Sequence, residues 1–476
     1  MRSFSFAALA AAGPARPFAH DLRRVFVAIA ALKLILLLID PTPRFFLWDS
    51  VTYLQGALDG PLPRDRSFLY SFLIRLFAVS THSLYVLVIA QTLAGVASAL
   101  LIYAMLRRSL ETSHRAALIA AVVVTLAPSQ LFYEHMLMAE AFGGLLWIGF
   151  LFAVLEYLRE GRLGWLLGVV LLGILTIAFR LNGTAVIVLT GLLLPLLRAL
   201  WTRKADADAR PGPRGGALAL QFGLALACTF VLHVGYRNVV AEVAHTPPGY
   251  IGTEGLFLLG YVAPAVRADD FRGTGCRDDV LQDVKADIHD PHNRERMLWG
   301  DNGLWRAMQQ ACPQPETAAT TVAHRAFHRI GPYVLPMAFS TEAQYFDDAE
   351  ATWRMDSDLG RKGMLPLELI QPVQRVFGMN IDRNAFTDSL TLLAFQHSRW
   401  LLTAVFFACP LLAVVLLFAA GRLRQPPGAR ALGLIMLGMF VCQFLLSPII
   451  SFRYLHPFPP LDVLALAALL GARRAT

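Results

Sequence analysis

An acidic residue is expected at the water-exposed boundary of an otherwise apolar protein. It lies in residues 44–70, RFFLWDSVTYLQGALDGPLPRDRSFLY. Asp49 follows the first long apolar run, and Tyr53 and Gly56 share its side of a helix. The opposite side is apolar and recurs at helical spacing, with Leu47, Val51, Leu54 and Leu58. Asp49 would then face a cavity. The alternative is an ordinary extramembrane loop in which the acid is only solvated.

Three further groups of polar residues are expected on the same side of the membrane. Glu140 opens the predicted fourth span, Arg180 lies at a turn, and Ser451–Tyr454 with His456 separates the last two spans. Ionisable groups at membrane depth are costly, so they usually face a cavity or a partner. Each alone is compatible with snorkelling or a local ion pair. Their occurrence on one side favours a common site.

Composition predicts that these residues belong to a polytopic membrane protein. Hydrophobic residues make up 56% and charged residues 16% of the chain, whereas soluble domains carry roughly a quarter charged residues. Mean hydropathy is +0.52. Arg and Lys exceed Asp and Glu, 42 against 34, but they fall in short loops between apolar runs. The net charge of +8 therefore indicates topology, and no nucleic-acid partner is implied.

Apolar runs near the length of a membrane span recur along the chain, because only helices that satisfy their own backbone can cross lipid. The opening residues resemble a short signal peptide, but Arg16, Arg23 and Arg24 follow at once, which favours a cytoplasmic tail and an uncleaved first span. We expect an all-α polytopic membrane protein of about ten spans, with basic loops and both termini in the cytoplasm. The predicted spans are 25–39, 84–106, 115–127, 141–158, 165–179, 184–197, 217–234, 400–420, 432–450 and 461–470.

Segments outside these spans divide the chain into three predicted parts. Residues 1–235 form an N-terminal membrane module, whose first outer loop, 40–80, includes an interfacial helix near 68–79. Residues 236–396 form a small, mostly helical outer domain, and residues 397–476 return to the membrane. Helical periodicity is expected at 318–330 and 365–377, and residues 129–140 are expected as a short outer loop.

The cysteines are consistent with this topology. Cys228, Cys409 and Cys442 fall in predicted spans, where a thiol is a small apolar group. Cys276 and Cys312 share the long outer segment, where an oxidising compartment would favour a disulfide.

The order of these motifs resembles the GT-C superfamily of glycosyltransferases. The motifs are WDSVTYLQGA, PLPRDRSFLYSFLIRLF, PSQLFYEHMLMAEAF, FRLNG and the terminal FRYLHPFPPLDVLALAALL. Within the superfamily, the chain is most similar to the protein O-mannosyltransferase and aminoarabinose-transferase branch. The family's paired Pro before the aromatic Leu-Tyr is absent, and Arg66–Phe68 takes its place. The resemblance covers most of the membrane part and leaves out the long outer segment.

This resemblance implies an inverting enzyme that moves a sugar from a polyprenyl phosphate to an acceptor at the periplasmic face of a bacterial inner membrane. Asp49 occupies the place of the general base, and Glu140 that of a second acid. The donor phosphate would meet Arg453 and, less directly, Arg180, with Tyr454 and His456 beside them. The acceptor cavity would be lined by Tyr53, Arg66, Tyr70, Glu134 and His135.

No catalytic metal is predicted, although a divalent cation is possible. His324 with His328 and His289 with His292 are spaced to bind a cation, but neither pair has a third ligand nearby. Two alternative functions stay open. An O-antigen ligase or polymerase would rely on Arg and His in the outer loop. A lipid-linked sugar transporter or flippase would be expected to show internal repeats with broken helices, and none is found.

Overall fold

The computed structural model describes residues 15–58, 60, 62–181, 183–202, 215–284, 297–298, 300–359, 367–380, 389–422, 426–447 and 449–471. Throughout this part of the chain the regular elements are helices, and one isolated bridge joins Arg44 to Met136. The predicted all-α class is confirmed. His289 and His292 lie outside the described residues.

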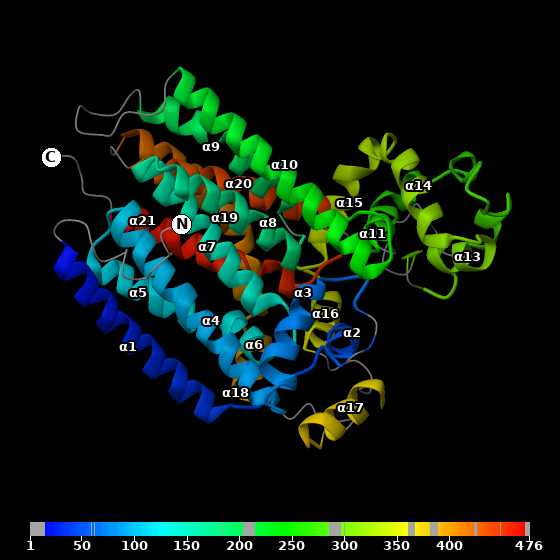
Figure 1. Cartoon of the computed structure of the whole chain (residues 1–476), viewed down its shortest axis with the longest axis horizontal. Helices are drawn as coiled ribbons and strands as arrows, with labels where there is room; N and C mark the ends of the chain where they lie inside the picture. Colours follow the sequence, from blue (N-terminus) through cyan, green and yellow to red (C-terminus); the bar gives the residue numbers. More distant parts are fainter. Residues whose placement is uncertain are drawn as a thin grey trace.

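The long helices run side by side in one bundle (Figure 1). Its members are α1 (Ala15–Ile39), α4 (Leu84–Ala104), α5 (His114–Thr125), α6 (Pro128–His135), α7 (Glu140–Glu160), α8 (Leu163–Phe179), α9 (Thr184–Thr202), α10 (Gly216–Ala244), α19 (Arg399–Arg422), α20 (Pro427–Leu446) and α21 (Phe458–Gly471). Among the described residues, seven helical segments are long and apolar enough to cross a membrane, or up to eight if the bent pair α5 and α6 forms one span. The predicted count of about ten spans also included α1, which carries Lys33, and α8, which is short.

Basic residues from three separate parts of the sequence lie close together in the bundle. At one end, Arg108 and Arg159 bind Glu156 on α7 at 2.9 and 2.5 Å, and Arg198 on α9 donates to the carbonyl of Leu158 at 3.3 Å. The predicted grouping of the basic loops is therefore confirmed for these residues. Glu140 begins α7, whose 21 residues separate it from that end by about 30 Å at the helical rise.

The first segment beyond the bundle contains the two helices expected there. Helix α2 spans Leu47–Ala57, and α3 (Phe68–Ile74) continues into a π-helical turn at Arg75–Val79. On the predicted apolar side of α2, Val51 and Leu54 are buried and Leu58 is half-buried. Gly56, expected beside Asp49 at a cavity, instead faces protein: an added Cβ would lie 2.8 Å from Pro63 and 2.9 Å from Ser71.

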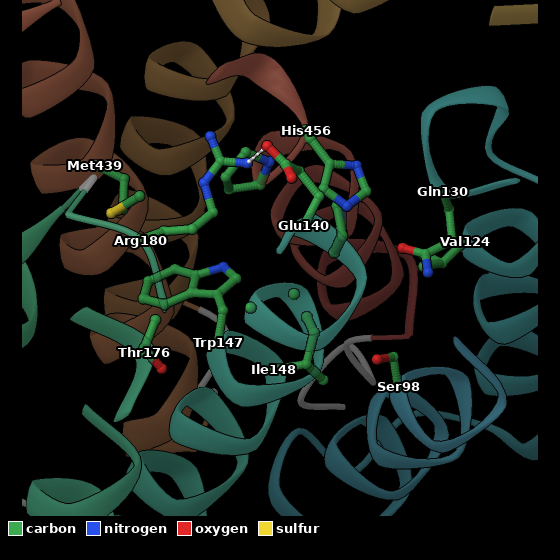
Figure 2. A pocket seen from close by; sticks show the side chains of 14 residues that line it. Ser98, Val124, Gln130, Glu140, Trp147, Ile148, Thr176, Arg180, Met439 and His456 are labelled. Carbon is green, nitrogen blue, oxygen red and sulfur yellow. Dashed lines mark hydrogen bonds and ion pairs between the residues drawn. The ribbon is translucent and has the colours of Figure 1, made fainter. Parts of the chain in front are cut away.

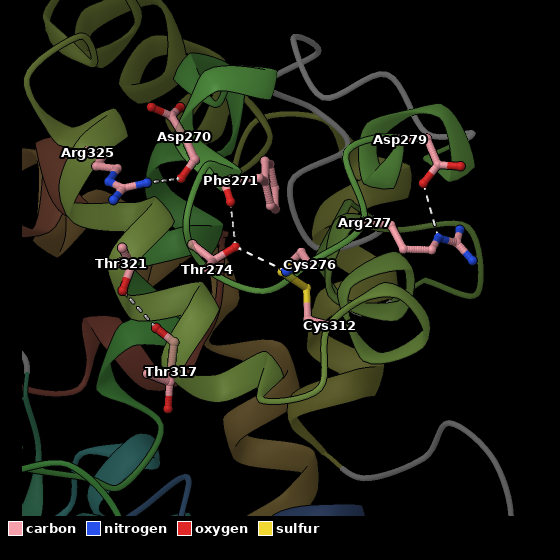
Figure 3. The surroundings of a disulfide bond; sticks show 10 residues. All are labelled: Asp270, Phe271, Thr274, Cys276, Arg277, Asp279, Cys312, Thr317, Thr321 and Arg325. Carbon is pink, nitrogen blue, oxygen red and sulfur yellow. Dashed lines mark hydrogen bonds and ion pairs between the residues drawn. A yellow bond between two sulfur atoms is a disulfide. The ribbon is translucent and has the colours of Figure 1, made fainter.

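A second, smaller core lies beyond the same end of the bundle (Figure 1). Helices α11 (Glu254–Val262), α13 (Leu304–Ala311) and α14 (Pro315–Phe327) pack around it. Cys276 and Cys312 form the predicted disulfide, which ties the loop after α11 to the end of α13 (Figure 3).

Shorter helices complete this region. They are α15 (Gly331–Ala343), α16 (Asp348–Asp358), α17 (Leu367–Phe377) and α18 (Leu390–His397). The helices predicted at 318–330 and 365–377 correspond to α14 and α17.

The prediction of a loop at residues 129–140 is wrong, because most of this segment belongs to helix α6. Pro128 is the first residue of α6, a position where its missing N–H costs nothing, and α6 bends from α5 by 49°. Glu134 on α6 binds Lys33 of α1, with both carboxylate oxygens 2.8 Å from Nζ. Gly95 on α4 permits this contact, since an added Cβ would collide with Glu134.

We predict that this ion pair holds the bent α5 and α6 against α1. Lys33 is 2% and Glu134 1% exposed, and removing one partner of such a pair typically costs about 3–5 kcal/mol. Lys33→Met and Glu134→Gln should each lower the thermal unfolding midpoint in detergent. The double variant Lys33→Met/Glu134→Met should recover part of the loss, because it leaves no buried charge unpaired. Single variants that melt like the wild type would contradict this role.

Candidate functional site

The backbone before α2 is fixed by the segment that follows α6. The Arg44 N–H donates to the His135 carbonyl at 2.8 Å, and the Leu137 N–H donates to the Arg44 carbonyl at 2.8 Å. The Ser50 hydroxyl, on the first turn of α2, donates to the Leu137 carbonyl at 2.9 Å. Asp49 is therefore positioned by contacts on both sides of it.

Asp49 binds two arginines from distant parts of the chain. Arg66, in the loop before α3, and Arg453, between α20 and α21, each pair with one of its carboxylate oxygens. The Arg453 Nη1 to Asp49 Oδ2 distance is 2.8 Å. Burial alone would raise the pKa of Asp49, but the two guanidinium groups outweigh burial and hold that pKa below its ordinary value. Asp49 is therefore a carboxylate at neutral pH.

Arg453 is held in place by a buried carboxylate on α16. Asp358 accepts from the Ser451 hydroxyl at 2.9 Å and from the Phe452 N–H at 2.6 Å. Tyr345 also binds the backbone of Ser451. Its hydroxyl donates to the Ser451 carbonyl at 3.1 Å and accepts from the Ser451 N–H at 3.2 Å. These bonds fix the start of the 3₁₀ turn Phe452–Leu455, which carries Arg453.

A pocket adjoins this cluster inside the bundle (Figure 2). Glu140, at the start of α7, binds Arg180, at the end of α8, with 2.8 Å between Oε1 and Nη1. Figure 2 shows His456 beside this pair and Trp147 below it. The lining continues over largely apolar side chains, with Val124, Ile148, Met439, Pro457 and Pro460 among them.

Polar atoms in this pocket lack partners in the part of the chain that the structure describes. They are Glu140 Oε2, Trp147 Nε1 and His456 Nδ1, all buried. Buried polar atoms are normally hydrogen-bonded, so unpaired ones call for an explanation. One acceptor, one N–H donor and one imidazole nitrogen around an apolar pocket suit a ligand that has a polar head and an apolar body.

Tyr53 lies between the two ion pairs. Burial raises the pKa of its hydroxyl, and the charges that act on it include Arg66, Glu140, Asp49 and Arg180. Its ring packs edge-on against Tyr70, 4.8 Å between centroids. The Tyr70 hydroxyl donates to Gln91 at 2.6 Å, so Tyr70 is part of the core behind the site.

The predicted site residues fall into two groups. Asp49, Arg66, Arg453 and Tyr454 come together, since Arg453 Nη2 also lies 3.3 Å from the Tyr454 hydroxyl. Glu140, Arg180 and His456 line the adjoining pocket.

Glu134 and His135 are buried but are not among the residues that line this pocket. Glu134 binds Lys33 and accepts from Gln130, a pocket residue, at 2.8 Å. The His135 ring bonds the Leu131 carbonyl through Nδ1 at 2.7 Å. No group of three or more His, Cys, Asp or Glu side chains gathers as a metal site in the described ranges.

Two residues of this architecture are absent from the predictions. Asp358 is one of many acids in the long outer segment, and nothing in its neighbourhood marks it. Lys33 carries a signal, because it is the one charge within the apolar run 25–39. Ionisable residues in such runs usually have a named partner, and here that partner is Glu134.

Fold and site together define a multi-pass helical membrane protein that has a charged cluster at one end and a partly apolar pocket beneath it. Residues 65–228 match the family model of dolichyl-phosphate-mannose-protein mannosyltransferases. The match covers about a third of the chain and confirms the predicted resemblance. It supports a GT-C glycosyltransferase. The matched stretch contains Arg66, Glu140 and Arg180, whereas Asp49 and Arg453 lie outside it.

Two solved structures are also similar. They are crystal structures of ArnT from Cupriavidus metallidurans, one in the apo state and one bound to undecaprenyl phosphate. Each is 13% identical with a TM-score of 0.36, over 91% and 93% of this chain and 77% of the other. A comparison with curated proteins finds no match.

We predict that Asp358 stabilises the turn that carries Arg453. Asp358→Ala would leave the Ser451 hydroxyl and the Phe452 N–H buried without their acceptor, at about 1–3 kcal/mol for each group. The thermal midpoint in detergent should fall clearly for Asp358→Ala and less for Asp358→Asn, which keeps an acceptor oxygen. Glu350→Ala, at an exposed position of the same helix, is the control. Equal midpoints for Asp358→Ala and Glu350→Ala would rule the role out.

Proposed function

We propose that this chain is an inverting glycosyltransferase that takes a sugar from a polyprenyl-phosphate donor and delivers it to an acceptor on the periplasmic face of the inner membrane. The observation that carries the proposal is Asp49 paired with Arg453 next to a pocket whose head is polar and whose walls are largely apolar. Such a pocket suits a phosphate attached to a lipid tail. The match to residues 65–228 supports the reaction class.

Asp49 is the general base in this proposal. Its carboxylate takes the proton of an acceptor hydroxyl while the hydroxyl oxygen forms a bond to the anomeric carbon. The bond from that carbon to the phosphate oxygen breaks on the opposite face, and the electron pair leaves with the polyprenyl phosphate. The configuration at the anomeric carbon is inverted. Glu140 is the second acid and orients the acceptor through its unpaired oxygen.

Arg453 links donor binding to the release of the base. Bound to Asp49 at 2.8 Å, its guanidinium neutralises the carboxylate that must accept a proton. The donor phosphodiester carries one negative charge, as the carboxylate does, and it too can bind a guanidinium in a fork geometry. It therefore competes for Arg453 and leaves Asp49 with Arg66 alone. Arg180 and His456, beside the same pocket, are placed to meet the remaining phosphate oxygens.

Asp49→Asn should abolish transfer while donor binding persists. Loss of a general base reduces the rate by about 10²- to 10⁴-fold. Envelope glycans of cells that carry the wild type, Asp49→Asn or no protein would be compared by mass spectrometry, and donor binding would be measured on purified protein. Asp65→Asn is a matched control, because Asp65 also binds Arg66, at 2.6 Å, and belongs to the same loop.

The outcomes separate the proposed classes. Normal glycans with Asp49→Asn would exclude Asp49 as base and favour an enzyme of the ligase or polymerase type. Movement of a labelled lipid across the bilayer by the purified protein, with no new glycosidic bond, would indicate a transporter.

We also predict that Arg453 and Arg66, which both bind Asp49, contribute unequally to the affinity for the donor. Arg453→Gln should weaken binding of a labelled polyprenyl phosphate by about 10- to 100-fold, the size expected for a lost hydrogen bond to a charged group. Arg66→Gln should weaken that binding less, since Arg66 also binds Asp65. Equal effects of the two variants would contradict the assignment of Arg453 to the phosphate.

A further inference from the structure

Helix α15 has an outward face that is entirely apolar. Leu335, Phe339 and Ala343 recur along one side of α15, and Phe346 follows in the turn after it. Leu335, Phe339 and Phe346 are 55%, 63% and 58% exposed. Between residues 331 and 346, Glu342 is the one side chain that can carry a charge near neutral pH, and it is buried. Neither of its oxygens has a hydrogen-bond partner among the described residues. A helix in water normally has a polar outer side.

The same face continues the exposed apolar surface of two candidate membrane spans, α19 and α20. The Phe339 ring packs on Phe444 of α20 with 5.3 Å between centroids, and the Phe346 ring packs on Phe407 of α19 at 5.1 Å. Further along α19 the surface residues Leu411 and Phe418 are also exposed and apolar. Figure 1 shows α15 at the end of α20, beside the bundle.

The depth of α15 can be read from its neighbours on α19. Arg399, the first residue of α19, binds Asp348 and Thr352 on the polar helix α16. Phe407 lies eight residues further along, about 12 Å deeper at the helical rise. Phe346 is therefore beside the third turn of a membrane span, whereas α16 is level with its polar start. With 13 residues, α15 is too short to cross the roughly 30 Å hydrocarbon core.

We propose that α15 is inserted in the bilayer, with Leu335, Phe339 and Phe346 in contact with acyl chains of the leaflet on the side of the Asp49 site. The occupant of this face is lipid, because the face is uncharged and continuous with the outer surfaces of α19 and α20. Part of the segment predicted as an outer aqueous domain is then membrane-embedded. This inference does not depend on the reaction that the protein catalyses.

Spin labels on the full-length protein in nanodiscs test the proposal. Cys228, Cys409 and Cys442 would be replaced by Ser with the disulfide kept, and labels placed at Leu335→Cys and Phe339→Cys. Phe418→Cys is the lipid reference and Arg272→Cys, 80% exposed in the small outer core, is the water reference. Molecular oxygen partitions into lipid and a neutral nickel chelate into water. The oxygen-to-nickel accessibility ratio at Leu335 and Phe339 should approach that at Phe418 and exceed that at Arg272 several-fold.

A ratio like that of Arg272 would overturn the proposal. So would labels that are immobile and reached by neither reagent, because a second protein surface would then cover the face. The wild-type chain provides a second test that needs no substitution. A lipid with a photoactivatable acyl chain should form adducts on peptides from residues 331–346 and none on α14, and adducts confined to the long spans would also overturn it.

Discussion

The ion pair between Asp49 and Arg453 joins residues 404 positions apart, and the site depends on it. A carboxylate at the edge of a membrane bundle needs a fixed cation, since a charge in a low-dielectric position is costly when unpaired. The first outer segment supplies the acid, and the turn between the last two spans supplies the cation. The contacts of Ser50 with Leu137 and of Asp358 with Phe452 make the pair a property of the whole fold.

Two more buried ion pairs lie in the bundle. Glu140 with Arg180 lines the pocket, and Lys33 with Glu134 joins α1 to α6. The second pair is fully hydrogen-bonded, because Lys33 also donates to the Thr125 carbonyl and Glu134 also accepts from Gln130. The pair at the pocket is not, since one Glu140 oxygen has no partner in the described chain. A satisfied network suits structural support, and an unsatisfied one suits a site that receives a ligand.

Much of the bundle could be predicted from the sequence, because runs of apolar residues are a direct consequence of lipid as solvent. The grouping of basic loops, the disulfide and the helices of the first outer segment follow from local rules of the same kind. Helix α6 could not be predicted from the sequence, since a proline such as Pro128 can mark either the end of one helix or the start of another. Asp358 could not either: its importance comes from one long-range contact, which composition and periodicity do not encode. Lys33, a charge within an apolar run, indicates a buried ion pair, but the sequence does not identify its partner, which is 101 residues away.

In the proposed reaction, Arg453 would bind Asp49 in the resting site and the donor phosphate in the loaded site. Its backbone is fixed by Asp358 through the Phe452 N–H, so the guanidinium can exchange partners without moving the chain. A guanidinium offers several donors in one plane, and here these already reach Asp49 and the Tyr454 hydroxyl. An anion arriving from the pocket side would meet donors that are positioned before it binds. In the proposed reaction, exchange of one carboxylate for one phosphate would leave the bonds between Asp358 and the backbone of this turn in place.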